Sequence, residues 1–333
     1  MQIDIAQSTP TAASIARLVQ AFYDLGQVVA SEFLIGRFNQ SYRLDFADGR
    51  RVVARLSPER FRGGPNIAFE AAALAHWADA GCAVARCLLA ANGEAAIRMQ
   101  LPEGPRALML FEHLEGEATG DSVEHIALLA HGLAALHAAG ESYGGPPSAY
   151  TLDLDHLLHR PLEALLRGST MTAELRPLYE EIGRRLADDI LAFGELSRVL
   201  CHGDTHGYNN FIAADAKGQR RALFFDFDEA GPGYLAYEIA VYPWSLYPRM
   251  PDGVMSEKAR SQWLAFIGAY REVRPVADVD LAAIPRFMAV RQLWLLGEYA
   301  ARIPDWGSQS IPTDYLHQQT AMLRAWQTLE LPL

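Results

Sequence analysis

Apolar residues recur at intervals of three and four near the start of the chain, and this spacing predicts an amphipathic helix. The recurring positions are Ile15, Leu18, Val19 and Phe22. Gly26 follows them and is a typical helix stop. From residue 28 the chain changes to short runs of β-forming residues over 32–35, 41–46 and 51–56, with turns between them. These runs predict three antiparallel strands.

A second helix and two more strands complete the predicted first lobe. Pro65 and Asn66 open an alanine-rich helix over 67–79, and Gly81 ends it. Two further strand-like runs follow over 95–100 and 106–111, and the turn between them contains two prolines and a glycine. We therefore expect a five-stranded antiparallel sheet with a helix.

Beyond Gly116 the pattern is mainly helical. Apolar periodicity predicts helices over 126–140, 175–193, 261–273, 287–299 and 314–329. A strand, loop and strand pattern over 199–227 interrupts them. The expected fold class is therefore α+β, with a sheet-rich first lobe and a mostly helical second lobe.

Composition narrows the class of protein. The chain has 333 residues, half of them hydrophobic and 21% charged, which is typical of a globular protein and excludes a disordered one. The formal charge of −11 argues against a broad basic face for nucleic acid or anionic lipid, and mildly favours a cationic small-molecule partner. We expect no nucleic-acid partner; the sequence leaves the oligomeric state open.

Cysteine usage and hydropathy indicate a compartment. The three cysteines have neither zinc-site nor disulfide-framework spacing. The N-terminal residues lack a basic, apolar leader, and no run of eighteen apolar residues occurs. We expect a cytoplasmic enzyme with no membrane association.

The chemistry is concentrated in the strand, loop and strand segment. His202, Gly203 and Asp204 are followed five residues after the aspartate by Asn209, which is the spacing of a kinase catalytic loop. In such a loop the aspartate faces the acceptor hydroxyl and the asparagine faces a metal. Seventeen residues after Asn209, Asp226 ends a hydrophobic strand where kinases place a second metal ligand. Carboxylate and amide oxygens suit Mg²⁺, so Asn209 and Asp226 are the candidate metal ligands.

Two residues of the first lobe fit contacts to the nucleotide. Arg55 ends the third predicted strand, where protein kinases place a lysine that touches the α- and β-phosphates. Glu70 lies in the following helix, where the partner of that lysine would be. An arginine on the core side of a strand needs an anionic partner, and either phosphate or Glu70 would supply it.

At these residues the sequence resembles the aminoglycoside phosphotransferase and choline kinase superfamily, which includes type II homoserine kinase and the bacterial stress response kinase. The resemblance is carried by 51–58, 133–137, the loop from His202 to Asn209, and Asp226 with the pair Tyr237 and Glu238. It implies a protein-kinase-like fold and the use of ATP and Mg²⁺. Asp204 would be the catalytic base, with Asn209 and Asp226 as magnesium ligands.

The resemblance also implies a division of the chain. Residues 1–111 would form the ATP-binding lobe, and 117–333 the lobe that binds the acceptor and carries the catalytic residues. The hinge would be 112–116, with backbone from Glu112 to Glu115, including Leu114, meeting adenine.

Residues beside the predicted site have two interpretations. Asp228 and Glu229 would help bind a cationic acceptor or a second metal, or would only cap the next turn. His202 is interpreted as a structural residue that holds the loop, and Glu238 as support behind it. His206 would either steady a charge near the phosphates or be a solvated loop residue.

The acceptor stays open between several classes of molecule. A small molecule with a hydroxyl, of the amino alcohol or aminoglycoside type, is favoured by the acidic composition. Two alternatives are a serine/threonine protein kinase of the stress response type and a nucleotide-binding regulator without turnover.

Overall fold

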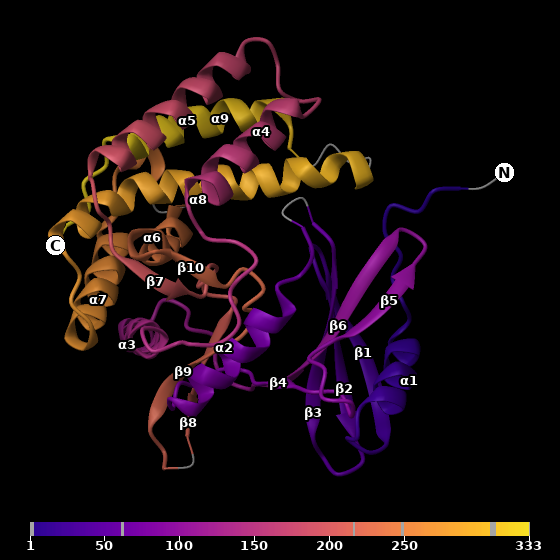
Figure 1. Ribbon diagram of the computed structural model, residues 1–333. Helices are drawn as coiled ribbons and strands as arrows, with labels where there is room; N and C mark the ends of the chain where they lie inside the picture. The colour runs from indigo at the N-terminus through magenta and orange to yellow at the C-terminus, as the bar shows by residue number, and fades with distance from the viewer. Residues whose placement is uncertain (1–2, 61–62, 216, 248–249, 307–310, 333) are drawn as a thin grey trace. The chain divides into compact units, whose positions relative to one another are not determined.

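The computed structural model divides the chain into two compact units (Figure 1). Unit 1 contains Met1–Glu115 and Tyr143–Pro147, and unit 2 contains Gly116–Ser142 and Ser148–Leu333. The structure describes residues 3–60, 63–215, 217–247, 250–306 and 311–332.

Unit 1 is built on an antiparallel sheet with the strand order β1-β2-β3-β6-β4, in which β5 also pairs with β6. The strands are β1 (Val28–Gly36), β2 (Gln40–Phe46), β3 (Arg51–Pro58), β4 (Cys87–Leu88), β5 (Ile97–Leu101) and β6 (Gly104–Glu112). Five of these correspond to the predicted strands. The sixth, β4, has only two residues, too few for a period-two pattern to indicate it.

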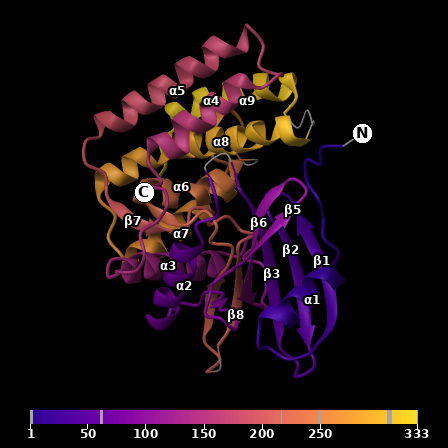
Figure 2. The ribbon, with the colours of Figure 1, turned by 45° about the vertical axis from the view of Figure 1, so that its right-hand side comes forward.

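One face of this sheet is covered by α1 (Ala12–Phe22), as Figure 2 shows. Ile15 and Val19 of the helix are fully buried in one cluster with Ala54 and Leu56 of β3. Side chains alternate across a strand, so Arg55 between them points to the opposite face. There it meets the second helix of the unit, α2 (Ile67–Asp79).

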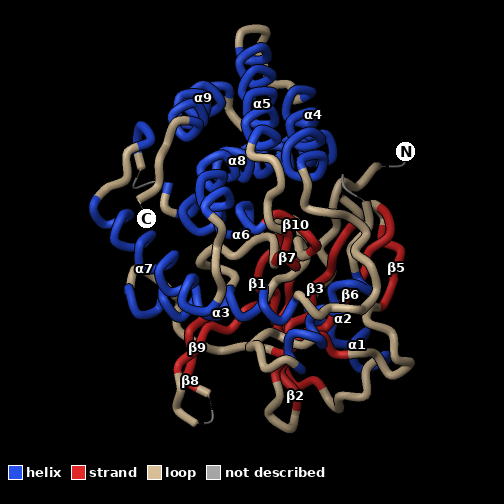
Figure 3. Tube along the Cα trace, turned by 60° about the vertical axis from the view of Figure 1, so that its left-hand side comes forward, coloured by secondary structure: helices blue, strands red, loops and turns tan. Residues whose placement is uncertain are grey.

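Unit 2 is mostly helical (Figure 3). Its helices are α3 (Val123–Gly140), the π-helix η1 (Asp155–His159), α4 (Arg160–Arg167), α5 (Leu175–Ala192), α6 (Leu235–Ser245), the 3₁₀ turn η3 (Pro251–Gly253), α7 (Glu257–Val273), α8 (Asp278–Trp306) and α9 (Thr313–Gln327). α6 is buried for most of its length and packs against α8, and α3 packs against α7. Among the described residues no helix combines the length and apolarity needed to cross a membrane.

Unit 2 also contains two short pairs of strands, which lie between helices in the sequence. β7 (Arg198–Cys201) pairs with β10 (Gly231–Tyr234), and β8 (Asn210–Ala214) pairs with β9 (Arg220–Phe224). The predicted α+β arrangement, an antiparallel sheet followed by a mainly helical region, is confirmed.

Candidate active site

Two loops of unit 2 carry the predicted catalytic and metal-binding residues, and both loops are fixed at both ends. The first loop, 202–209, connects β7 to β8, and the second, 225–230, connects β9 to β10. At one end Cys201 is paired with Gly231, and at the other Asn210 is paired with Phe224. Strand pairing therefore holds the two loops beside each other, with only the hairpin of residues 210–224 between them in sequence.

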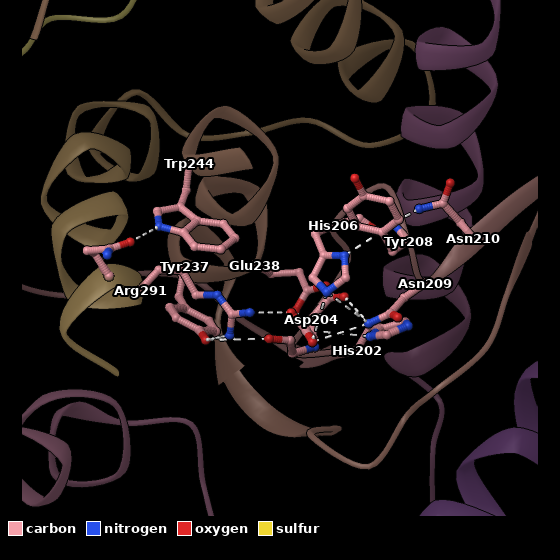
Figure 4. A network of polar contacts seen from close by, with 12 residues as sticks. His202, Asp204, His206, Tyr208, Asn209, Asn210, Tyr237, Glu238, Trp244 and Arg291 are labelled. Atoms are coloured by element: carbon pink, nitrogen blue, oxygen red, sulfur yellow. Dashed lines mark hydrogen bonds and ion pairs between the residues drawn. The ribbon is translucent and has the colours of Figure 1, made fainter. Parts of the chain in front are cut away.

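Asp204 lies at the centre of a polar network that Figure 4 shows from close by. Its Oδ1 accepts a hydrogen bond from Nη2 of Arg291, on α8. Its Oδ2 accepts from Nδ2 of Asn209 at 3.2 Å and lies 3.4 Å from Nε2 of His206. The carboxylate is only 19% exposed, yet both of its oxygens have partners.

These contacts determine the charge of Asp204. Burial by itself raises the pKa of the Asp204 carboxyl, but the Arg291 guanidinium lowers it, and His206 adds to that effect. The net result is a pKa well below the ordinary range of an aspartate. Asp204 is therefore a stable carboxylate at neutral pH, able to accept a hydrogen bond from a hydroxyl.

The histidines of the loop serve its geometry. Nδ1 of His202 accepts from the backbone N–H of Asp204 at 3.3 Å, and its Nε2 donates to the carbonyl of Phe225 at 3.1 Å. Burial lowers the pKa of His202 to about 4, so the ring is neutral and joins the two loops. Nδ1 of His206 accepts from the N–H of Tyr208 at 3.2 Å, which leaves the proton on the Nε2 that faces Asp204.

Glu238 of α6 supports the loop from behind, as the sequence interpretation expects. Its side chain is fully buried, and its Oε2 accepts from the backbone N–H of Gly203 at 2.8 Å. Gly203 itself has φ +86°, a left-handed conformation that favours glycine. A Cβ at this position would lie 2.3 Å from the carbonyl oxygen of Glu229, in the second loop. Glycine is required here because the two backbones approach so closely.

Replacing Gly203 by alanine should therefore lower the free energy of unfolding by about 2 kcal/mol or more, since it adds a backbone clash to a strained φ. Gly207 in the same loop is the matched control, because a Cβ there meets nothing within 4 Å. The free energy of unfolding of Gly207→Ala should stay within about 0.5 kcal/mol of the value for the parent. Urea unfolding followed by circular dichroism measures both variants. Equal stabilities of the two variants would contradict the close approach.

Glu238 should also make stability depend on pH. Burial raises its pKa to about 7, and the Gly203 amide only partly offsets this. Because the folded pKa of Glu238 lies above the unfolded one, protonation of Glu238 stabilises the folded state. This contribution to the free energy of unfolding is complete below about pH 4 and is lost as pH rises through 7. The free energy of unfolding of the parent should therefore decline by on the order of 2 kcal/mol between pH 5 and 7, and we expect Glu238→Gln to remove this decline.

The measurement for Glu238 is the urea unfolding free energy of the parent and of Glu238→Gln across that pH window. His202 titrates with the opposite sign, because its folded pKa is lowered, but it does so in both proteins. The difference between the two curves therefore reports Glu238. Parallel curves would show that Glu238 does not titrate in this range.

The candidate metal ligands lie at the same end of the β8 and β9 hairpin. Asn209 directly precedes β8, and Asp226 follows β9 by two residues. The backbone N–H of Phe225 donates to the carbonyl of Asn209 at 3.1 Å, which extends the hairpin as far as these residues. Nδ2 of Asn209 also donates to the Asp204 carbonyl at 2.9 Å, so its amide oxygen is the atom oriented for a further ligand.

Asp226 has an unusual backbone. Its φ is +65°, and among the described residues only Asp252 shares a positive φ without being glycine. Strain of this kind gathers at functional positions, where the surrounding structure imposes it. The side chain of Asp226 is exposed, so the carboxylate is accessible to a ligand.

Asp228 and Glu229, the predicted acceptor contacts, follow Asp226 in the second loop. The Asp228 carbonyl accepts from the hydroxyl of Tyr150 at 2.8 Å, and the N–H of Ala230 donates to the carbonyl of Phe227 at 2.9 Å. Asp228 is half-buried and Glu229 is 4% exposed. These backbone bonds fix a turn, and an acceptor-binding role for the two carboxylates stays a prediction.

In unit 1, Arg55 and Glu70 form a buried, two-pronged ion pair. Nη1 of Arg55 lies 2.8 Å from Oε1 of Glu70, and Nη2 lies 2.6 Å from Oε2. The guanidinium also stacks 4.8 Å from the ring centre of Phe111 on β6. Glu70 thus supplies the anionic partner that the sequence requires, and contact of Arg55 with a nucleotide stays a prediction.

The predicted hinge begins where β6 ends. The N–H of Glu112 donates to the carbonyl of Arg86 at 3.0 Å, and Oε2 of Glu112 accepts from the N–H of Arg86 at 3.2 Å. Within the described chain, the backbone N–H and carbonyl of Leu114 make no hydrogen bond. The backbone of Leu114 is therefore able to meet a ligand, and its place in a hinge stays a prediction. Glu115 is the last residue of this part of unit 1.

Comparison with known protein families shows which family the chain belongs to. The model of the phosphotransferase enzyme family matches residues 29–276, which is more than half of the chain and includes both loops. The chain belongs to the phosphotransferase enzyme family. As a family member it is a kinase, an enzyme that transfers a phosphoryl group.

Relatives of this phosphotransferase match along most of its length. An uncharacterized protein of Deinococcus radiodurans is 34% identical over 319 residues, covering 96% of this chain and 90% of its own. A homoserine kinase of Caulobacter sp. strain K31 is 29% identical over 303 residues, covering 86% of this chain and 84% of its own.

Solved structures share the fold at lower identity. The amicoumacin kinase hAmiN, in complex with AMP-PNP, Ca²⁺ and Ami, has a TM-score of 0.72 and 18% identity, covering 96% of this chain and 92% of its own. A microcompartment-associated aminopropanol kinase has a TM-score of 0.70 and 18% identity, covering 94% and 95%. The predicted protein-kinase-like fold is thereby confirmed.

A divalent metal fits the residues of this phosphotransferase. Among the described residues no three His, Cys, Asp or Glu side chains gather as a metal cage. Mg²⁺ that accompanies a nucleotide does not need such a cage, because phosphates and water fill most of its shell and one or two protein ligands suffice. The amide oxygen of Asn209 and the exposed carboxylate of Asp226 are such a set.

Sequence reasoning did not identify Arg291, although it contacts the central carboxylate of this phosphotransferase. It is 87 residues from Asp204 in sequence and belongs to no motif. The available signal was an arginine inside a strongly apolar helix, between Phe287 and Trp294 at helical spacing. A buried arginine requires an anionic partner, but the sequence could not show which one.

Proposed function

We propose that this phosphotransferase moves the γ-phosphoryl group of ATP to the hydroxyl of a small amino alcohol, in the cytoplasm. The observation that carries the proposal is the joint fixing of the two loops, which brings Asp204, Asn209 and Asp226 to one end of paired strands. Phosphoryl transfer depends mainly on positioning and electrostatic stabilisation, and this arrangement supplies both.

Asp204 has the central role in the proposed reaction. Its ionised carboxylate accepts a hydrogen bond from the acceptor hydroxyl and turns the oxygen toward the phosphorus in line with the leaving group. The lowered pKa makes Asp204 a weak base, so it orients the hydroxyl first and receives the proton only as the new bond forms.

Asn209 and Asp226 hold the metal in the proposal. When bound, Mg²⁺ neutralises charge that develops on the phosphate oxygens. Asn209 has a second task, because its amide nitrogen also holds the carbonyl and the carboxylate of Asp204. The Asn209 side chain would thus fix the position of the metal relative to the Asp204 carboxylate that orients the acceptor.

Unit 1 supplies nucleotide contacts in the proposal. Arg55, held by Glu70, would interact with the phosphates, and the backbone of Glu112 and Leu114 would contact adenine. The planar guanidinium of Arg55 is suited to phosphate, although two of its nitrogens already bind Glu70.

The Arg55 assignment predicts different effects on stability and on ATP binding. Arg55→Met should lower the free energy of unfolding by about 3–5 kcal/mol, because it leaves the Glu70 charge buried and unpaired. Replacing both residues by Met and Leu should recover most of that stability. If Arg55 contacts phosphate, the double variant stays folded and still loses ATP affinity in calorimetric titration. Parent-like ATP affinity in the double variant would restrict Arg55 to a structural role.

An amino alcohol is favoured as the acceptor class for two reasons. The net charge of −11 attracts a cationic molecule. In addition, the family relatives include a homoserine kinase and an aminopropanol kinase by name, and both names denote molecules with an amine and a hydroxyl.

An acceptor panel with coupled detection of ADP tests the proposal. The panel contains 1-amino-2-propanol, ethanolamine, choline, L-homoserine and an aminoglycoside, each with ATP and Mg²⁺. We expect one of the amino alcohols to accelerate ADP release. Radiolabelling of proteins from a lysate without labelling of any small molecule would favour a protein kinase. ATP binding without accelerated ADP release by any acceptor would favour a regulator.

A further inference from the structure

Arg291 is the residue that connects the helical core of unit 2 to the catalytic carboxylate. It lies in the middle of α8, is 2% exposed, and donates through Nη2 to Oδ1 of Asp204. We propose that Arg291 is a positioning residue for the transfer reaction, which holds the Asp204 carboxylate in the orientation that accepts the acceptor hydroxyl. The inference rests on the proposed function of the same site.

The guanidinium of Arg291 is itself held by residues of α6 and α8, and Figure 4 shows its contact with the hydroxyl of Tyr237. Its central carbon lies 4.9 Å from the ring centre of Trp244 on α6 and 4.2 Å from that of Trp294, one turn further along α8. Nη1 donates to the hydroxyl of Tyr237 at 3.3 Å. The Trp244 ring is fixed in turn, because its Nε1 donates to Oε1 of Gln292 at 2.8 Å.

A purely structural ion pair would not require this arrangement. A buried guanidinium with rotational freedom could follow a mobile carboxylate, whereas a guanidinium between two indole rings has one plane and one donor direction. The direction of the Nη2 donor therefore fixes Oδ1, and Asn209 and His206 approach Oδ2. Asp204 is thus held by charged or polar partners at both oxygens.

The division between the two oxygens leaves a place for the hydroxyl. A carboxylate has about four lone-pair positions, two on each oxygen. Arg291 takes one on Oδ1, and Asn209 and His206 approach the two on Oδ2, so one position on Oδ1 stays available to the acceptor. Small errors in this orientation are costly, because a displacement of about 1 Å lowers rates by about 100-fold.

The charged and titratable groups around Arg291 agree with this role. From the loop they are Asp204, His202 and His206, and from α6 they are Tyr237 and Glu238. Burial by itself lowers the pKa of Arg291, but Asp204 and Tyr237 raise it, so the guanidinium keeps its charge. His202 is neutral, which makes Arg291 the main positive charge at the carboxylate.

Arg291→Ala tests the proposal, with ATP, Mg²⁺ and 1-amino-2-propanol or L-homoserine as the reactants and ADP release as the readout. We expect kcat to fall about 100-fold while the KM for ATP stays unchanged. Added guanidinium ion should restore part of the lost kcat, because it fits between the Trp244 and Trp294 rings.

Arg302→Ala is the matched control, because Arg302 is a second buried arginine of the same helix. It should show no rescue by guanidinium. Arg291→Lys keeps the charge without the planar fork, and it serves if the alanine variant fails to fold; we expect a partial loss of kcat. A parent-like kcat in Arg291→Ala or Arg291→Lys would overturn the proposal. A loss of kcat in Arg291→Ala that guanidinium does not rescue would also overturn it.

Asp204→Asn in the same assay separates this inference from the proposed function. If Asp204→Asn abolishes ADP release and Arg291→Ala does not, only the role of Arg291 is wrong. If Asp204→Asn leaves acceptor-dependent ADP release unchanged, the proposed function fails and the positioning role fails with it.

Discussion

Replacing Asp204 by asparagine should lower kcat by about 10²- to 10⁴-fold while ATP binds nearly as tightly as in the parent. Asparagine keeps the size of the side chain but removes the charge that accepts the hydroxyl hydrogen bond and, later, the proton. Acceptor-dependent ADP release measures kcat, and calorimetric titration measures ATP affinity. We expect the loss only in the first of these two measurements.

The fold must be intact for this comparison, because Asp204→Asn also breaks the ion pair with Arg291. A parent-like circular dichroism spectrum and a cooperative urea transition that begins above the assay conditions would establish that. Asp215→Asn is the control variant, since Asp215 lies in the turn at the opposite end of the β8 and β9 hairpin. It should keep full turnover. An active Asp204→Asn variant would remove Asp204 from the mechanism.

Replacing Asp226 should abolish the part of nucleotide binding that depends on Mg²⁺. Asparagine is the informative substitution because it tolerates the left-handed φ of +65° and removes only the charge. We expect the affinity for ATP in Mg²⁺ to fall by at least about 10- to 100-fold, the size of effect that even outer partners of a metal have. ATP affinity in EDTA should stay close to that of the parent.

A second variant separates the charge of Asp226 from its backbone strain. Asp226→Gly relieves the strain and also removes the carboxylate. It should lose Mg²⁺-dependent binding as Asp226→Asn does, whatever its stability. Calorimetric titration of ATP with and without Mg²⁺ measures both variants. Retained Mg²⁺ dependence in both would show that the metal, if bound, is held elsewhere.

Much of the fold could be predicted because local patterns decide it. α2 begins and ends at the predicted residues, since Asn66 and Gly81 flank an alanine-rich run and little else competes there. The longer strands of unit 1 were predictable from alternation and β-forming residues. β4 was not, because a strand of two residues owes its existence to the pairing with β6 rather than to its own sequence.

The helices of unit 2 show where local patterns fail. The predicted helix over 287–299 is the middle of α8, which runs from Asp278 to Trp306. α6 has no clear polar face, because it is buried for most of its length, so apolar periodicity could not indicate it. Burial from all sides is a property of the packed unit and leaves no alternation in the sequence.

The catalytic loop illustrates the same division at the site. The sequence by itself indicated the candidates for the chemistry: Asp204, Asn209 and Asp226 stand at the spacing of a kinase catalytic loop and its second metal ligand, and Gly203 is a residue that tolerates a left-handed turn. Short-range spacing is enough here because a loop and its two flanking strands are a local structure.

Only the tertiary structure decided what surrounds Asp204. The pairing of Cys201 with Gly231 and of Asn210 with Phe224 placed the two loops side by side, and the packing of α8 on α6 brought Arg291 to the carboxylate. The physical reason is that an ion pair depends on distance in space and leaves no periodic trace in the chain. The Asp204 carboxylate and the Arg291 guanidinium are 87 residues apart in sequence, and they meet only after α8 has packed on α6.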